Sequence, residues 1–239
     1  MRTLIIIMLI LIAFVPVFLL GFYIYKKDSE KEPKVLLTKL FVSGLIGSII
    51  MIIIDLFVAI YYPNLYLLNT SFKAGYLLTF VLVFLQIGLL EEVIKWFFIR
   101  VVGYDNKEFD QIYDIIVYCV FVGLGFAFFE NMFYVLQGGI RVGILRGLLS
   151  VPAHAVYGVF MGYFLAKAKL SKTTLKHVLF IILSIFVPTV LHTLYDYILM
   201  FDGEMYLYIV ILYMAILYTI SFMIIDKFSR KRGHLPKSN

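Results

Sequence analysis

Seven stretches of this sequence are each long and apolar enough to cross a lipid bilayer, and they limit the possible folds more than any other feature. A transmembrane helix needs about 20 mostly apolar residues. Within the hydrocarbon, only helices and closed barrels satisfy their own backbone hydrogen bonds. We therefore predict an all-α fold, a polytopic transmembrane helical bundle. Its expected spans are Thr3–Tyr25, Val35–Tyr61, Gly75–Val102, Ile112–Leu136, Gly147–Ala166, Val178–Phe201 and Tyr206–Ile225.

The composition indicates that the whole chain, residues 1–239, forms a single integral membrane domain. Apolar residues make up 63% of it and charged residues 15%, against roughly 45–50% and 25% in soluble domains. The net charge of +6 does not indicate a nucleic-acid partner. The basic residues lie in short loops and the tail, where contact with the lipid bilayer is expected. The one cysteine, Cys119, lies within an apolar span and excludes a disulfide framework or a thiolate metal site.

Lysine and arginine are distributed unevenly between the two sides of the expected bundle. Fifteen of them fall in the loops after spans one, three and five and in the tail, and four fall on the opposite side. Basic residues that flank membrane spans are retained in the cytoplasm. This distribution therefore predicts an N-terminus outside the cytoplasm and a cytoplasmic C-terminus.

Ionisable side chains within four consecutive spans are the main functional signal. A charged residue at the bilayer centre costs about 2.5–3.5 kcal/mol on insertion scales, so such residues are candidates for a functional site. From the rise per residue of a helix, we expect these groups to share one layer in the outer half of the bilayer. The candidates are Glu91, Glu92 and Lys95 in span three, Glu130 and Asn131 in span four, His154 in span five, and His192 and Asp196 in span six.

Span three contains two adjacent glutamates followed by a lysine. Glu91 and Lys95 are four residues apart and face the same side of a helix. We expect Lys95 to neutralise one glutamate and to leave the other available as a general base or a ligand. The alternative is an ion pair within one helix that only specifies helix packing.

Two further pairs of polar residues occur in spans four and six. Glu130 and Asn131 could join helices through a polar contact, which is worth about 1 kcal/mol in a membrane. His192 and Asp196 are four residues apart, a spacing that lets the carboxylate orient the imidazole. The first pair is equally compatible with a structural role, whereas the second favours function.

Span five contains one histidine and two glycines at a regular spacing. A single histidine on an apolar face, such as His154, is more often a packing residue than a ligand. Gly158 and Gly162 have the GxxxG spacing, which predicts close approach of two helices.

Taken together, these groups can hold and deprotonate a water molecule. No serine–histidine or cysteine–histidine arrangement indicates a nucleophile, and no HExxH motif is present. A carboxylate and an imidazole could activate the water directly, or a bound divalent metal such as zinc could do so. Both versions stay open, and the candidate metal ligands are Glu91, Glu130, His154 and His192.

Four short motifs in these spans resemble those of the PrsW intramembrane proteases, within the superfamily of CAAX-prenyl-protein proteases and bacteriocin-processing enzymes. The resemblance covers roughly residues 75–200, the expected catalytic core. Prenyl-protein proteases carry EExxxR and FxxxH, whereas here the lysine comes one residue earlier and a glutamate replaces the histidine. The motifs are EExxK (Glu91, Glu92, Lys95), FxxxEN (Phe126, Glu130, Asn131), HxxxG (His154, Gly158) and HxxxD (His192, Asp196).

The resemblance implies a multi-pass endopeptidase of the bacterial plasma membrane. Such enzymes make the first cut, near the extracytoplasmic side, in a single-span anti-sigma factor, and a stress sigma factor is then released. We expect a water-activating mechanism with Glu91 or Glu92 as the base and His192 at the oxyanion. The expected catalytic set is Glu91, Glu92, Glu130, His154, His192 and Asp196, supported by Lys95 and Asn131.

Two other functions are compatible with the same residues. Carboxylate–histidine relays also occur in proton- or ion-coupled transporters, but transporters often contain internal repeats, and no convincing repeat is visible here. A non-catalytic membrane protein could also use the same pocket only to bind a partner.

Overall fold

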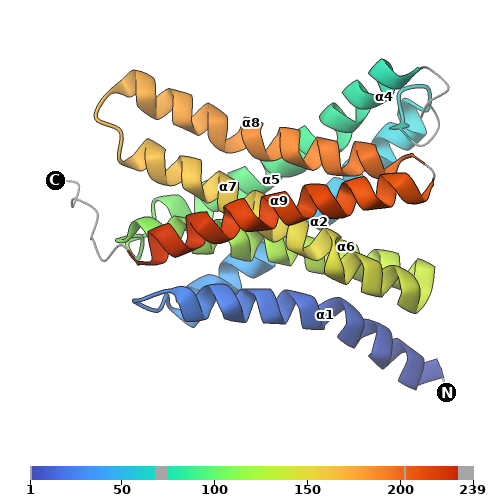
Figure 1. Ribbon diagram of the computed structural model, residues 1–239, viewed down its shortest axis with the longest axis horizontal. Helices are drawn as coiled ribbons and strands as arrows, with labels where there is room; N and C mark the ends of the chain where they lie inside the picture. The colour runs from blue at the N-terminus through green and yellow to red at the C-terminus, as the bar shows by residue number, and fades with distance from the viewer. Residues whose placement is uncertain (1, 68–74, 202, 231–239) are drawn as a thin grey trace.

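The computed structural model describes residues 2–67, 75–201 and 203–230, and this part of the chain contains helices and no strand. This confirms the expected all-α fold. Segments η1 and η2 are π-helical turns, and α4 to η2 form one continuous helix over Tyr76–Tyr104. The elements, in chain order, are α1 (Arg2–Lys27), α2 (Lys34–Tyr61), α4 (Tyr76–Val83), η1 (Phe84–Leu89), α5 (Leu90–Ile99), η2 (Arg100–Tyr104), α6 (Ile112–Leu148), α7 (Ser150–Lys169), α8 (Thr174–Leu199) and α9 (Glu204–Ser229) (Figure 1).

The stretch Ile112–Lys169 is apolar helix for 58 residues, yet it does not run in one direction. At Gly139 the backbone has φ 70° and ψ −162°, a conformation that favours glycine. A Cβ atom at Gly143 would lie 2.9 Å from a Val135 methyl group, whereas residues eight apart on a straight helix are separated by about 12 Å. The chain therefore reverses at Gly139, and the last turns of α6 run back with α7.

This reversal explains the number of membrane crossings. Six stretches of the described residues are long and apolar enough to span a membrane when Ile112–Lys169 is counted once. Its two antiparallel arms are each long enough to cross, which gives the seven spans expected. The expected spans left the residues between Leu136 and Gly147 unassigned. Helix occupies both sides of Gly139, because one glycine suffices for the reversal.

The helices lie roughly along one axis, and α1 begins at the opposite end of the bundle from the end of α9 (Figure 1). This placement fits an odd number of crossings. The connections that follow α1, η2 and α7 lie together at the end of the bundle where α9 finishes. Which end faces the cytoplasm stays a prediction from the distribution of lysine and arginine.

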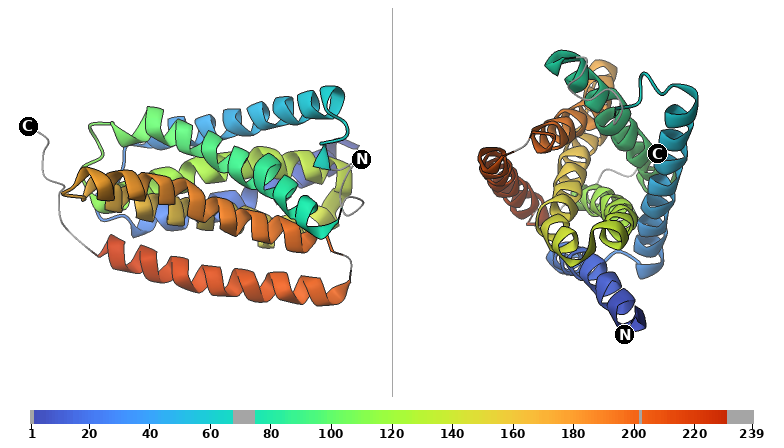
Figure 2. Two further views of the ribbon diagram at one scale, coloured as in Figure 1. Left: turned by 90° about the horizontal axis from the view of Figure 1, so that it is seen from above. Right: turned by 90° about the vertical axis from the view of Figure 1, so that its right-hand side faces the viewer.

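The hairpin of α6 and α7 forms the centre of the bundle. The end-on view places it among α1, α2, α8 and α9 (Figure 2). Its large side chains, such as Tyr118 and Met161, are buried, whereas outer helices expose apolar residues such as Phe18, Ile53 and Leu212. Exposed apolar side chains are stable against lipid, so this distribution agrees with a multi-pass membrane protein.

Glycines bring the hairpin helices into backbone contact. A Cβ atom at Gly158 would lie 2.8 Å from the Cys119 carbonyl oxygen, and one at Gly162 would lie 2.6 Å from Ile116 Cα. These distances are shorter than a side chain tolerates. The close helix approach predicted from the GxxxG spacing is confirmed.

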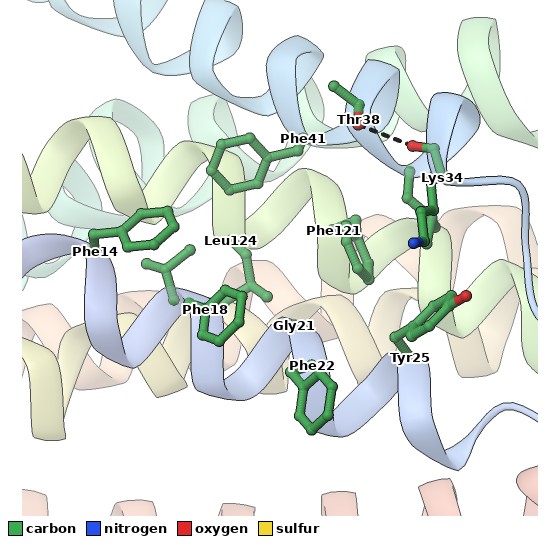
Figure 3. A pocket seen from close by; sticks show the side chains of 12 residues that line it. Phe14, Phe18, Gly21, Phe22, Tyr25, Lys34, Thr38, Phe41, Phe121 and Leu124 are labelled. Carbon is green, nitrogen blue, oxygen red and sulfur yellow. Dashed lines mark hydrogen bonds between the residues drawn. The ribbon is translucent and has the colours of Figure 1, made fainter.

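An apolar cavity of about 500 Å³ lies between α1, α2 and α6. Figure 3 shows the aromatic rings that line it, with Lys34 at one end. None of the ionisable residues of spans three to six lines this cavity. It is therefore separate from the candidate functional site.

We expect Gly158→Ala to lower the thermal unfolding temperature of the purified protein, because the added methyl group meets the backbone of α6. Overpacking of this kind costs about 1–3 kcal/mol. The matched control is Gly21→Ala in α1, where a Cβ atom would make an ordinary contact of 3.5 Å with Leu124. Equal melting temperatures for the two variants would contradict this account of the hairpin.

Candidate functional site

The paired glutamates lie on α5, directly after a π-helical turn. In that turn, a Cβ atom at Gly88 would lie 2.3 Å from Thr193 Oγ1 and 2.9 Å from the Thr189 carbonyl oxygen. The absence of a side chain at Gly88 thus lets α5 and α8 approach closely. This contact brings Glu91 and Glu92 to the histidine of α8.

Lys95 contacts both glutamates and a histidine from another helix. Its Nζ lies 2.7 Å from Glu92 Oε1, 3.2 Å from Glu91 Oε2 and 3.0 Å from His154 Nδ1, and it also lies 4.3 Å from the centre of the Phe126 ring. Lys95 is thus nearer to Glu92 than to Glu91, and its role of neutralising one glutamate stays a prediction. The helix geometry places i+3 and i+4 partners within reach of one flexible ammonium group.

His192 lies between carboxylates on both sides of its ring. Its Nδ1 is 2.9 Å from Glu92 Oε1, and its Nε2 is 3.1 Å from Asp196 Oδ2 and 3.9 Å from Glu91 Oε2. The pairing with Asp196 predicted from the i, i+4 spacing is therefore present. Because ionised carboxylates only accept hydrogen bonds, both ring nitrogens can donate to them only when the imidazole is protonated.

His154 has a different set of partners and a different charge. The Lys95 ammonium is a donor only, so His154 Nδ1 accepts from it. The proton is then on Nε2, which lies 2.9 Å from Glu130 Oε2. The contacts thus assign a neutral His154 beside a charged His192, and the centres of the two rings are 5.2 Å apart.

Arg146, which lies between the expected spans four and five and was not among the candidates, completes the site. Its Nη2 lies 3.0 Å from Glu130 Oε1, and its guanidinium group stacks 3.9 Å from the centre of the Tyr134 ring. Glu130 precedes Gly139 by nine residues and Arg146 follows it by seven, so the reversal places both at similar depth. Nothing in the sequence indicated that the chain reverses at Gly139, and Arg146 was therefore missed.

Two buried polar side chains at the site have no hydrogen-bond partner among the described residues. Both polar atoms of Asn131 and the hydroxyl group of Tyr157 are in this group. The Tyr157 ring also stacks on His192 with 4.7 Å between ring centres. Sequence reasoning identified Asn131 but missed Tyr157, because one tyrosine among many apolar residues gives no distinct pattern.

The site as a whole carries more negative than positive charge. Four carboxylates (those of Glu91, Glu92, Glu130 and Asp196) are in contact with two permanent cations, Lys95 and Arg146, and with the protonated His192. Glu91 and Glu92 are almost fully buried, whereas the side chains of Glu130 and Asp196 are 23% and 25% exposed. The two more accessible carboxylates thus lie at the edge of the site.

The types of donor present suit a divalent metal. Glu91, His154 and His192 each offer one ligand atom, and these atoms lie within 4.8 Å of one another. Two imidazoles and one carboxylate form a donor set that is common for catalytic zinc. Glu130, the other expected ligand, is not in this group and pairs with His154 and Arg146 instead. The residues therefore fit a metal, which would have to replace the proton on His192, because ligating histidines are neutral.

Comparison with known proteins gives one family. Residues 32–224 match the model of a family described as PrsW family intramembrane metalloprotease. Protease PrsW of Clostridioides difficile is 31% identical over 234 residues, which cover 96% of this chain and 93% of the relative. Protease PrsW of Oceanobacillus iheyensis is 37% identical over 177 residues (74% and 76%), and that of Bacillus subtilis is 35% identical over 181 residues (76% and 77%). No solved structure matches the chain.

We expect Lys95→Met to destabilise the protein strongly, because it leaves two buried carboxylates without their shared cation. Removing one partner of a buried ion pair typically costs about 3–5 kcal/mol. Thermal unfolding of the purified variant measures the loss, and Lys39→Met, at an exposed lysine of α2, is the control. The double variant Lys95→Met/Glu92→Gln should recover part of the loss. An additive double variant would contradict the shared-cation arrangement.

Proposed function

Because the chain belongs to the PrsW family of intramembrane metalloproteases, we propose that it hydrolyses a peptide bond of a single-span membrane protein near the extracytoplasmic side. The observation that carries this proposal is the convergence of Glu91, His154 and His192 from three helices. Membership of a peptidase family sets aside the transporter alternative. The family is shown by the comparisons, and the substrate and the mechanism are what we propose.

A divalent metal bound in the site would fit the proposed reaction. Glu91, His154 and His192 would hold it. When bound, such a metal would polarise the substrate carbonyl and lower the pKa of a bound water. Their hydrogen-bond partners, such as Lys95, Glu130 and Asp196, orient these three residues.

In the version without a metal, Glu91 is the carboxylate best placed to take a proton from the attacking water. With a metal bound, Glu91 would be a ligand instead. Glu92 Oε1 is held by Lys95 at 2.7 Å and by His192 at 2.9 Å, whereas Glu91 Oε2 lies farther from both, at 3.2 and 3.9 Å. The more loosely held carboxylate keeps more of its basicity. The water oxygen then bonds to the carbonyl carbon, the C–N bond breaks, and the proton passes to the leaving amine.

In the version without a metal, the charged His192 is the group best placed to stabilise the charge that develops on the carbonyl oxygen. With a metal bound, His192 would be a ligand instead. Contacts with Glu92 and Asp196 on opposite sides of the ring fix its orientation, and the stacked Tyr157 ring fixes its plane. A preorganised donor of this kind stabilises an oxyanion without reorganisation during the reaction. Glu92 and Asp196 are therefore positioning residues in this mechanism.

The substrate class follows from the depth of the site and from the family. Glu130 lies about 13 Å of helix before the reversal at Gly139, near the end predicted to be extracytoplasmic. A cut at this depth removes the outer part of a single-span protein, which suits a first cleavage. An anti-sigma factor that retains a stress sigma factor is the substrate we propose.

Co-expression with a single-span anti-sigma factor tests the function directly. We expect wild-type protein to yield a fragment whose new end, located by mass spectrometry, lies in the outer half of the substrate span. Glu91→Gln and His192→Ala should each lower the cleavage rate at least about 100-fold. Each removes a metal ligand or, without a metal, the proton acceptor or the oxyanion donor.

Matched substitutions outside the site control for general effects on the fold. Glu204→Gln, at the exposed start of α9, and His177→Ala, in the first turn of the same helix as His192, should leave the rate near that of wild type. Cleavage at the wild-type rate by both Glu91→Gln and His192→Ala would refute the mechanism.

Metal removal tests the other part of the proposal. Purified protein treated with a zinc chelator should lose cleavage activity and regain it when zinc is restored, because the ion would polarise the carbonyl and activate the water. Elemental analysis should find about one zinc per active chain. A metal-free preparation with full activity would exclude the metal while leaving the roles of Glu91 and His192 intact.

A further inference from the structure

A second group of buried carboxylates lies at the other end of the bundle. Asp28 and Glu32 lie in the connection between α1 and α2, and Asp114 lies in the first turn of α6. All three are at least nine-tenths buried, and one carboxylate oxygen of each lies within 4.8 Å of the others. Asp114 and Glu130 are separated by 16 residues of α6, or about 24 Å, so this group is distinct from the candidate active site.

Hydrogen bonds account for only part of this group. Asp114 Oδ2 accepts from the backbone N–H groups of Asp110 at 3.1 Å and Gln111 at 2.6 Å, and Glu32 Oε2 accepts from the Tyr118 hydroxyl at 2.8 Å. Asp114 Oδ1 and both oxygens of Asp28 have no hydrogen-bond partner in the described chain. Nearby loop amides face Asp28 and favour its charged form, but none reaches hydrogen-bond geometry. Three buried acceptor atoms therefore lack a donor.

No cation of the described residues pairs with these carboxylates. Lys31, the nearest basic residue on the connection, donates to the backbone carbonyl oxygens of Lys26 and Asp28 instead. Among the ion pairs between described residues, none includes Asp28, Glu32 or Asp114. Burial raises the pKa of the Asp28 carboxyl and raises that of Glu32 to about 7. The arrangement thus lacks a positive charge at its centre.

We propose that Asp28, Glu32 and Asp114 bind a hard divalent cation of the Ca²⁺ or Mg²⁺ class. Oxygen ligands of carboxylate type select such ions, and the unpartnered oxygens of Asp28 and Asp114 supply free lone pairs. The absence of imidazole separates this site from the zinc-type donors around Glu91. The bound ion ties the α1–α2 connection to the start of α6, the central helix that also carries Glu130.

Thermal unfolding of the full-length protein in detergent, freed of metals and held at about pH 8, tests the proposal. Adding Ca²⁺ or Mg²⁺ to about 1 mM should raise the wild-type unfolding temperature by several degrees, because a ligand that binds only the folded state stabilises it. Asp28→Asn should lose this response. It should also unfold no earlier than wild type without cation, because the substitution removes repulsion between buried charges.

Two control variants isolate the site. Glu30→Gln removes the same charge from an exposed position of the same connection and should keep the full response. Glu91→Gln alters the candidate zinc site and should also keep it, so the two proposed sites can succeed or fail separately. No shift in wild type, or an equal shift in Asp28→Asn, would overturn the proposal and leave proton sharing among the carboxyls as the explanation.

A binding measurement covers the case in which Asp28→Asn does not fold. Electron paramagnetic resonance of Mn²⁺ should detect about one tightly bound ion per chain in Glu91→Gln, displaced by Ca²⁺. The double variant Glu91→Gln/Glu32→Gln should bind none. Unchanged Mn²⁺ binding in the double variant would refute this site.

Discussion

The contact of the Lys95 ammonium with Glu91, Glu92 and His154 is the interaction on which the rest of the site depends. Two adjacent carboxylates cannot remain charged in a membrane interior without a positive partner. Lys95 supplies that partner, and as a donor it also determines which nitrogen of His154 carries the proton. That proton faces Glu130, so one lysine on α5 fixes the hydrogen-bond directions of residues on α6 and α7.

The central hairpin makes these contacts possible. The reversal at Gly139 places Arg146 beside Glu130, and glycine contacts between α6 and α7 keep His154 close to the first arm. A Cβ atom at Gly123, for example, would lie 2.8 Å from the His154 carbonyl oxygen. The same helix α6 begins at the buried carboxylates of the α1–α2 connection. The first arm of α6 thus carries a buried or partly buried carboxylate near each end. Glu130 is balanced by Arg146, whereas Asp114 has no cationic partner among the described residues.

The composition and motifs of the chain predicted much of the site. The residues expected to be catalytic do meet, because each is a costly charge or imidazole in an apolar span and such residues face the interior of a bundle. Pairs within one helix, such as His192 with Asp196, were predicted from their spacing, whereas pairs between helices could not be predicted. Lys95 also contacts His154 on another helix, and Arg146, which lies between two expected spans, belongs to the site. Tyr157 gave no signal, since an aromatic residue in an apolar helix resembles a packing residue.

The sequence by itself determined the all-α membrane bundle, since apolar stretches of about 20 residues have few other stable structures in lipid. It also determined the set of ionisable groups and, through their motifs, the family. Only the tertiary structure decided which groups of different helices touch. Pair contacts depend on the rotation and closest approach of helices, which are set by glycines such as Gly88 packed on distant backbone. The approach of Asp28 and Glu32 to Asp114 was decided in the same way, because residues of a connection have no periodicity that shows where they fold.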